Sequence, residues 1–202
     1  MENIDNEDLD QIKINLKKQV QLNKIYLAVI SRYKNYIEEK ENISIAELPR
    51  YITPKNAEII KEADRIKAVY ENYDYEKNFY DASVVAYDFV KNEIEEISIP
   101  LEFWFYPNEI LEFKLGDILD KNILLCSLLI SLGNPSVKVF VTINDTKRNI
   151  FVYYEFNNKI YKLDLKDKIS VFNSKEEIMA ELLINEETIS YEFNDNIYLN
   201  IN

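Results

Sequence analysis

The sequence predicts an α+β fold in which helices come first and an antiparallel sheet follows. From residue 7 to residue 132 the apolar side chains recur with helical spacing in long segments, whereas after Pro135 they alternate with a period of two. The segment 123–133 is almost continuously apolar. We therefore expect N-terminal helices and then a buried central helix that packs on the sheet.

The first predicted helix covers residues 7–41, where the helical spacing is broken by neither Pro nor Gly. It is longer than most helices of globular proteins, so besides packing on the domain it is a candidate for homo-oligomerisation or partner binding. Residues 42–52 are predicted to be a connection. The second helix is predicted to begin at Thr53-Pro54, because threonine can cap a helix and proline suits its first position. We therefore divide the chain into residues 1–52 and an α+β domain of residues 53–202.

The apolar face of the second helix is expected to consist of Ala57, Ile60, Ala63, Ile66, Ala68 and Val69. A third helix is predicted at about 77–95, and the aromatic segment 97–117 is predicted to be mostly loop with a short helix at 108–112. The buried helix spans 117–132 and ends at Gly133. The predicted strands and the last helix follow in the order 137–141, 150–156, 159–163, helix 175–184 and a hairpin at 187–201. Tight turns are expected at Asn157-Asn158 and Asn194-Asp195.

Composition excludes several classes of function. The 202 residues contain no histidine, which removes Ser-His-Asp and Cys-His catalysis and His-ligated zinc sites. The two glycines, Gly116 and Gly133, cannot form a glycine-rich phosphate loop. The formal net charge of −12 argues against nucleic acid and anionic lipid as partners. The few basic residues that could form a local exception are Lys13, Lys17, Lys18 and Lys24 of the first helix.

The single cysteine, Cys126, excludes an intramolecular disulfide and suits a reducing compartment, so we expect a cytoplasmic protein. It lies in an apolar run, where a small buried hydrophobic residue is the preferred interpretation over a displaced nucleophile. We expect no signal peptide, no membrane insertion, no cofactor and no metal.

Three motifs occur in order between residues 97 and 164. They are the aromatic segment Trp104-Phe105-Tyr106-Pro107, the sequence Gly116-Asp117-Ile118-Leu119-Asp120 that opens the buried helix, and a predicted hairpin that runs from Asn149 to Asp164. This arrangement resembles the transglutaminase-like superfamily, which has a papain-like fold, in its microbial and archaeal branch. The resemblance implies a cysteine nucleophile at the start of the buried helix, a histidine on the adjacent strand and an aspartate on the next.

In this chain the corresponding positions are Ile118, Asn149 and Asp164. Isoleucine has no nucleophilic atom, and asparagine cannot accept a proton near neutral pH. The resemblance therefore implies a degenerate triad and no catalytic residue, because losing members of such a triad costs orders of magnitude in rate. Asp164 is then expected to bond Asn149 or a backbone amide.

These observations leave three hypotheses for the function. The first is an inactive transglutaminase-like domain that binds a protein or peptide or acts as a scaffold. Its candidate groove consists of Phe103, Trp104, Tyr106 and Asp120, because aromatic anchors dominate recognition surfaces. The second is a hydrolase-type enzyme that uses the carboxylates of Asp120 and Asp164, with or without a metal. The third is a structural protein that oligomerises through residues 7–41.

Overall fold

The computed structural model describes residues 6–40, 44–98, 103–143, 148–182 and 188–201, and the side chains of α1 from residue 12 to residue 36. The chain divides into two compact units, one of residues 1–42 with 101–103 and one of residues 43–100 with 104–202. The first unit contains α1 (Asn6–Lys40), a single helix of 35 residues, as predicted. Within the described residues, no helix combines the length and the apolarity needed to cross a bilayer.

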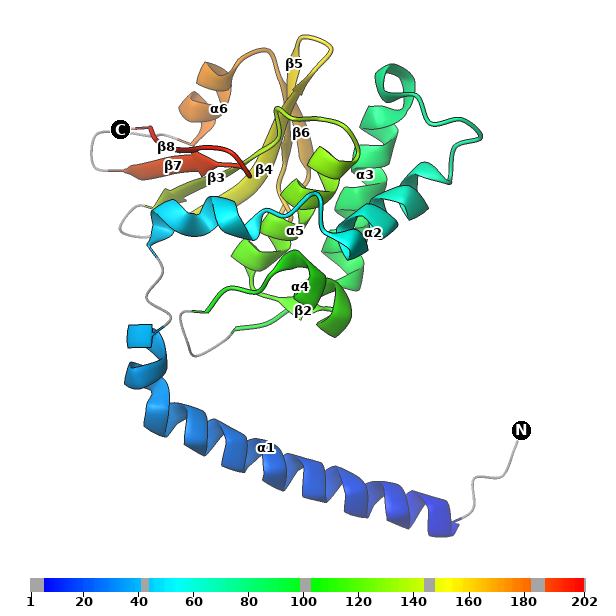
Figure 1. Ribbon diagram of the computed structural model, residues 1–202, viewed down its shortest axis with the longest axis vertical. Coiled ribbons are helices and arrows are strands. Elements are labelled where there is room, and N and C mark those ends of the chain that lie inside the picture. The colour runs from blue at the N-terminus through cyan, green and yellow to red at the C-terminus, as the bar shows by residue number, and fades with distance from the viewer. Residues whose placement is uncertain (1–5, 41–43, 99–102, 144–147, 183–187, 202) are drawn as a thin grey trace. The chain divides into compact units, whose positions relative to one another are not determined.

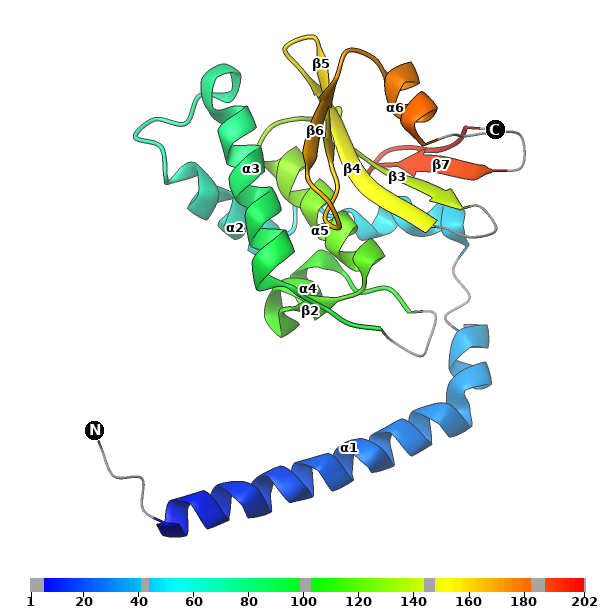
Figure 2. The same ribbon diagram turned by 180° about the vertical axis from the view of Figure 1, so that it is seen from behind.

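The second unit contains all the other elements, and it has the predicted α+β architecture (Figures 1 and 2). Its helices are η1 (Ile45–Tyr51, a 3-10 helix), α2 (Ala57–Lys67), α3 (Tyr75–Glu93), α4 (Pro107–Phe113), α5 (Ile118–Ser131) and α6 (Lys175–Glu181). Its strands are β1 (Glu95–Glu96), β2 (Leu115–Gly116), β3 (Lys138–Ile143), β4 (Arg148–Phe156), β5 (Lys159–Leu163), β6 (Ile169–Phe172), β7 (Ile189–Phe193) and β8 (Tyr198–Asn200).

The six strands β3 to β8 form one antiparallel sheet in the order β6-β5-β4-β3-β7-β8. The turn between β4 and β5 lies at Asn157 and Asn158, whose φ angles of 49° and 57° are the left-handed values that a tight hairpin requires. The predicted C-terminal hairpin is also present, and Asn194 begins its turn by donating its backbone N–H to the carbonyl of Ile197. Strand β6 and the short parallel pair of β1 with β2 were not predicted.

The two faces of the sheet carry different cores, because side chains alternate along each strand. On β4, Ile150 and Val152 belong to the large core that includes α2, α3 and α5. The intervening Phe151 belongs to a smaller core with Phe140 of β3 and Ile178 of α6. Figures 1 and 2 show α6 on the side of the sheet that lies away from α2 and α3.

Helix α5 is the centre of the large core, as its apolar run predicted. Its residues from Leu119 to Leu129 are all buried, and it packs against α2, α3, α4, β3 and β4. The helix stops at Gly133, whose φ of 119° a residue with a side chain rarely adopts. A Cβ atom at this position would also lie 3.2 Å from the Cδ2 atom of Tyr75.

Two expectations about the N-terminal part of this unit were wrong. Residues 42–52 are not a simple connection, because η1 forms within them and buries Leu48 and Tyr51. Helix α2 does not begin at Thr53-Pro54: Asn56 caps it instead, by accepting the N–H of Glu58. The second unit begins at residue 43, before the boundary expected at residue 53.

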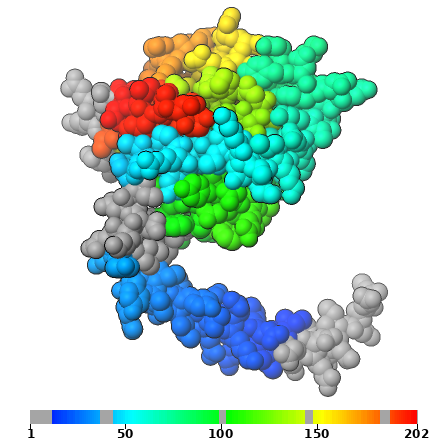
Figure 3. Space-filling model, in the orientation of Figure 1, coloured from blue at the N-terminus to red at the C-terminus, as the bar shows by residue number. Residues whose placement is uncertain are grey.

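The later start also changes which residues of α2 face the core. Its buried residues are Ile59, Ala63 and Ile66, whereas Ile60 is 41% exposed and Val69, beyond the helix, is 68% exposed. The η1 helix lies close to the C-terminal strands, because it contacts β8. Figure 3 shows this proximity, with η1 in cyan beside the C-terminal strands in red.

Replacing a leucine of α5 tests the central position of this helix. Leu125 is fully buried, so Leu125→Ala is expected to lower the free energy of unfolding by about 2–5 kcal/mol. Leu199→Ala in β8 is the matched control, because Leu199 is 48% exposed and its loss is expected to cost less than about 1 kcal/mol. Urea unfolding of the two variants measures the difference, and equal losses would contradict a core centred on α5.

Candidate functional site

The resemblance places its nucleophile at the start of α5, and in the structure this helix end is closed by two aspartates. Asp117 is the N-cap and accepts the N–H of Asp120 at 2.8 Å. The Oδ2 atom of Asp120 accepts the N–H of Asp117 at 3.0 Å, so the two residues form a reciprocal capping box. Ile118, the position of the nucleophile, is half-buried and packs on the core. The N–H groups of Asp117 and Asp120 are thus both bonded within the chain.

Asp120 also binds the aromatic segment. Its Oδ1 atom accepts the N–H of Phe105 at 3.1 Å, and its side chain is fully buried. Burial raises the pKa of this carboxyl to about 7, and the negative charges of Asp117 and Glu109 act in the same direction. The hydrogen bonds from the N–H groups of Asp117 and Phe105 oppose the shift and do not cancel it. Asp120 is therefore an internal anchor, and the expectation that it lines an open groove is wrong.

Cys126 has the environment of a structural residue. It lies two turns beyond Ile118 in α5 and is fully buried. Burial raises the pKa of its thiol well above the ordinary value, and the negative charge of Asp195 contributes in the same direction. A nucleophilic cysteine needs access and a lowered pKa, and Cys126 has neither.

Asn149 does not face α5. It pairs with Thr142 across β3 and β4, and its Nδ2 atom donates to the Thr142 Oγ1 atom at 3.0 Å. By strand alternation it shares a face with Phe151 and the smaller core, whereas α5 packs on the opposite face. By the same alternation the residues of β4 on the α5 side are Arg148, Ile150, Val152, Tyr154 and Phe156, and none of them is a base near neutral pH.

Asp164 holds a turn directly after β5. Its Oδ1 atom accepts the N–H of Lys166 at 2.9 Å, and its backbone carbonyl accepts a hydrogen bond from the hydroxyl of Tyr87 at 2.9 Å. The expected bond to a backbone amide is therefore present. The contacts described for Ile118, Asn149 and Asp164 join none of them to another. Their assignment as former triad positions remains a prediction.

An aromatic cluster of three residues lies on the second unit. Tyr51 of η1 stacks on Tyr106, with ring centroids 4.7 Å apart and an angle of 19° between the planes. Trp104 meets the same Tyr51 ring edge-on at 5.8 Å. Tyr51 is buried, Trp104 is half-buried and Tyr106 is 43% exposed, so the stack has one accessible side. Phe103 belongs to the first unit, and Tyr51 was missed because η1 was not predicted.

The other face of the sheet carries a buried ion cluster that the sequence did not indicate. Glu192 of β7 is 2% exposed, and its Oε1 atom lies 2.9 Å from the Nζ atom of Lys138. Its Oε2 atom accepts hydrogen bonds from Lys175 and from the hydroxyl of Tyr153. Burial opposes the charged form of Glu192, but these three donors outweigh it and lower the pKa of Glu192. The donors come from β3, β4 and α6, so no sequence spacing relates them.

The described residues contain no group of three or more His, Cys, Asp or Glu side chains that could hold a metal ion.

The variant Asp120→Asn tests the buried carboxyl. The pKa of Asp120 is about 7 in the folded chain, above its ordinary value of 3.8. Between these pH values the unfolded chain has lost the proton and the folded chain keeps it, so this group makes the fold less stable as the pH rises from about 4 to about 7. Relative to the parent chain, the free energy of unfolding of Asp120→Asn is therefore expected to increase as the pH rises across this range. Urea titrations measure this change. A difference in unfolding free energy between the two chains that stays constant from pH 4 to pH 7 would contradict a raised pKa of Asp120 in the folded chain.

The variant Glu192→Gln tests the ion cluster. It removes the charged acceptor of three hydrogen bonds and leaves Lys138 and Lys175, which are 24% and 33% exposed, without their carboxylate. This is expected to cost about 2 kcal/mol of unfolding free energy. Glu58→Gln is the matched control, because Glu58 pairs with Lys61 at 3.4 Å and both side chains are exposed, at 58% and 78%. An exposed pair contributes less than about 1 kcal/mol. Equal losses in chemical denaturation would show that the cluster adds nothing beyond a surface pair.

No family model and no curated protein matches the chain. Among solved structures it is similar to LapG from Legionella pneumophila treated with EGTA, with 12% identity and a TM-score of 0.49 over 79% of this chain and 86% of that one. It is also similar to a proposed cysteine protease from Cytophaga hutchinsonii, with 16% identity and a TM-score of 0.47 over 76% of this chain and 50% of that one. These likenesses concern the arrangement of helices and strands, and they assign no activity to the chain.

Proposed function

We propose that the second unit is a catalytically inactive, transglutaminase-like domain that binds a peptide segment of a partner protein. The absence of catalysis is inferred from the residues at the start of α5. Ile118 occupies the nucleophile position there, and Asp117 and Asp120 form the capping box of the helix. The buried Cys126 cannot replace the missing nucleophile. The α5 side of β4 offers no base, whichever of its residues is taken as the counterpart of the histidine.

The order of elements supports the proposed relationship. A buried helix is followed by antiparallel strands, and a hairpin leads to Asp164, as the resemblance implies. The alternative of a carboxylate-dependent hydrolase gains no support from the site. Both oxygens of Asp120 accept backbone N–H groups in a fully buried position, and Asp164 holds the turn that follows β5.

The aromatic cluster supports binding. Tyr106 presents one face to Tyr51 and is 43% exposed, so a side chain of a partner can stack on or beside it without a change in the fold. Two hydrogen bonds fix the backbone at Tyr106. The N–H of Tyr106 donates to the Glu109 Oε2 atom at 2.8 Å, and the N–H of the preceding residue, Phe105, donates to Asp120. A rigid aromatic anchor loses little conformational entropy when it binds.

Selection from a displayed library of random peptides tests the binding proposal. Peptides enriched on the whole chain are expected to bind Tyr106→Ala at least 10-fold more weakly, which is the loss typical of an anchor residue. Tyr80→Ala is the matched control, because Tyr80 is also a partly exposed tyrosine, at 37%, and lies on α3. Equal affinities for both variants, or no enrichment, would reject the aromatic cluster as the binding surface.

Assays with a fluorescent casein substrate and an amine donor test the loss of catalysis separately. The parent chain and Asp164→Ala are both expected to show only the background rates of hydrolysis and transamidation. Turnover by the parent chain that falls in Asp164→Ala would contradict the proposal.

A further inference from the structure

The middle of helix α1, residues 12–36, is cationic in a chain that is acidic overall, and acidic residues flank it at both ends of the helix: Glu7, Asp8, Asp10, Glu38 and Glu39. From Ile12 to Tyr36 the sequence has six lysine or arginine residues and no aspartate or glutamate. The rest of the chain therefore has 18 cationic against 36 acidic residues. The net charge of −12 is a sum over the whole chain and does not show this local excess of positive charge. A basic amphipathic helix favours an anionic partner.

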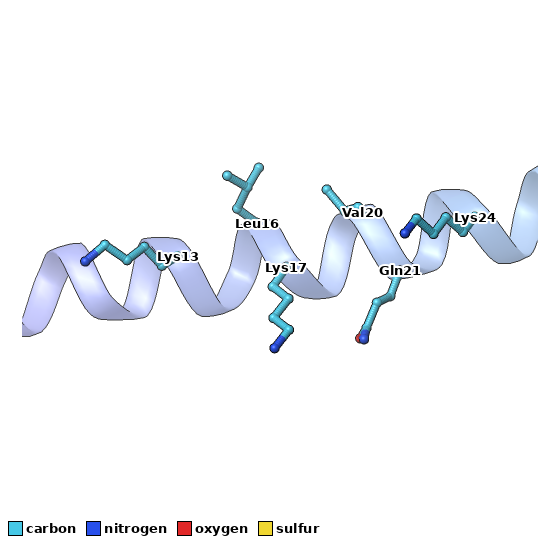
Figure 4. Close-up of a pocket in the computed structure, with 6 residues that line it drawn as sticks. All are labelled: Lys13, Leu16, Lys17, Val20, Gln21 and Lys24. Carbon is cyan, nitrogen blue, oxygen red and sulfur yellow. The ribbon is translucent and has the colours of Figure 1, made fainter.

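The charges lie on one half of α1. At 3.6 residues per turn, Lys13, Lys17, Lys18, Lys24 and Arg32 project from one half of the helix, and Lys34 is the exception. The other half presents most of the large apolar residues: Ile12, Leu16, Val20, Leu22, Tyr26, Leu27, Val29, Ile30 and Tyr33. Three more, Ile14, Ile25 and Tyr36, lie on the cationic half. Figure 4 shows the boundary, where Leu16 and Val20 point to one side and Lys17 and Gln21 point to the other.

The apolar half is accessible and wide. Leu16 is 63% exposed, and Tyr26 and Leu27 are each 54% exposed. Three uncharged polar residues, Asn15, Gln19 and Asn23, interrupt this half, and the last two hydrogen-bond to each other at 3.1 Å. The bond lowers the cost of placing them against an apolar medium. The half-circumference width suits a flat surface better than the narrow seam of a coiled coil.

Charge disfavours a second copy of α1 as the partner. Two copies paired along residues 12–36, in either direction, would bring six cationic residues against six, with no acidic residue between them. Like charges across a helix pair are destabilising. An anionic surface neutralises the same residues.

We infer that α1 binds in the plane of an anionic phospholipid bilayer. Its apolar half enters the boundary between headgroups and acyl chains, and Lys17, Lys18, Lys24 and Arg32 lie toward the anionic headgroups. Tyr26 and Tyr33 suit this depth, because tyrosine has an apolar ring and a polar hydroxyl. The inference goes beyond the proposed function and does not depend on the aromatic cluster.

Co-sedimentation with vesicles tests the inference on the whole chain. Vesicles of 70% phosphatidylcholine and 30% phosphatidylserine are expected to bind the chain, and pure phosphatidylcholine vesicles are expected to bind it at least 10-fold more weakly. The triple variant Lys17→Gln, Lys18→Gln, Lys24→Gln is expected to reduce binding to the anionic vesicles on the order of 100-fold. Leu16→Gln with Leu27→Gln is expected to abolish binding at the same charge.

A second triple variant controls for net charge. Lys61→Gln, Lys77→Gln and Lys166→Gln remove three lysines of the second unit whose side chains are 78%, 79% and 60% exposed, and they are expected to leave vesicle binding within about 2-fold. Absence of binding to anionic vesicles, equal binding to neutral vesicles, or equal losses in the two triple variants would overturn the inference. Sedimentation velocity that shows a dimer of the parent chain, abolished by Leu16→Gln with Leu27→Gln, would assign the face to a second copy and would also overturn it.

Discussion

The hydrogen bonds of the Asp120 carboxyl are the interaction on which the arrangement around α5 depends. One buried side chain caps the helix through the N–H of Asp117 and fixes the aromatic segment through the N–H of Phe105. The next residue, Lys121, is also buried and donates to the carbonyl of Ile94 at the end of α3 at 2.7 Å. One turn of α5 thus orients the two segments that flank it. These bonds offset part of the cost of burying an ionisable group so close to Asp117 and Glu109.

The first turn of α5 is relevant to both parts of the proposed function, the absence of catalysis and the binding of a peptide. In the transglutaminase-like arrangement that the sequence resembles, the start of this helix is the place for a reactive cysteine, whose thiolate the helix dipole favours. Here the helix end is satisfied by Asp117 and Asp120, and Ile118 contributes only packing. The bond from Phe105 holds the neighbouring Tyr106 in register with Tyr51. In the proposed function, this turn of α5 therefore serves as a structural support for the binding surface.

Much of the fold could be predicted from the sequence because its signals are local. The apolar run of α5, its stop at Gly133 and the hairpin at Asn157-Asn158 each follow from neighbouring residues. The η1 helix could not be predicted in this way, since its burial of Leu48 and Tyr51 depends on distant elements such as β8. Helix α2 starts later than expected because Asn56 caps it in place of Thr53.

The candidate site was harder to predict, because a shift of one residue along a strand changes the face of the sheet. Asn149 illustrates this: the motif order selects it, but the pairing with Thr142 places it on the face away from α5. Asp120 was identified, but its burial follows only from the packing of the aromatic segment. The partners of Glu192 come from three elements, and spacing in the sequence gives no indication of them.

Residues 12–36 of α1 form a cationic stretch with acidic residues on both sides of it, in a chain that is acidic elsewhere. The net charge of the whole chain therefore describes neither part. Helix α1 is the part suited to an anionic surface, and the aromatic cluster of the second unit is the part suited to a peptide. The two proposals rest on different residues and can fail independently.

The most direct measurement is an NMR titration of the side-chain carboxyl carbon of Asp120, with Asp120→Asn to assign the signal. We expect a midpoint near pH 7, because the carboxyl is buried beside the negative charge of Asp117 and the two backbone N–H groups that donate to it do not cancel this effect. The N–H resonances of Asp117 and Phe105 are expected to shift with the same midpoint. A midpoint near the ordinary value of 3.8, or amide resonances that do not follow it, would contradict the closed helix end on which the proposed function depends.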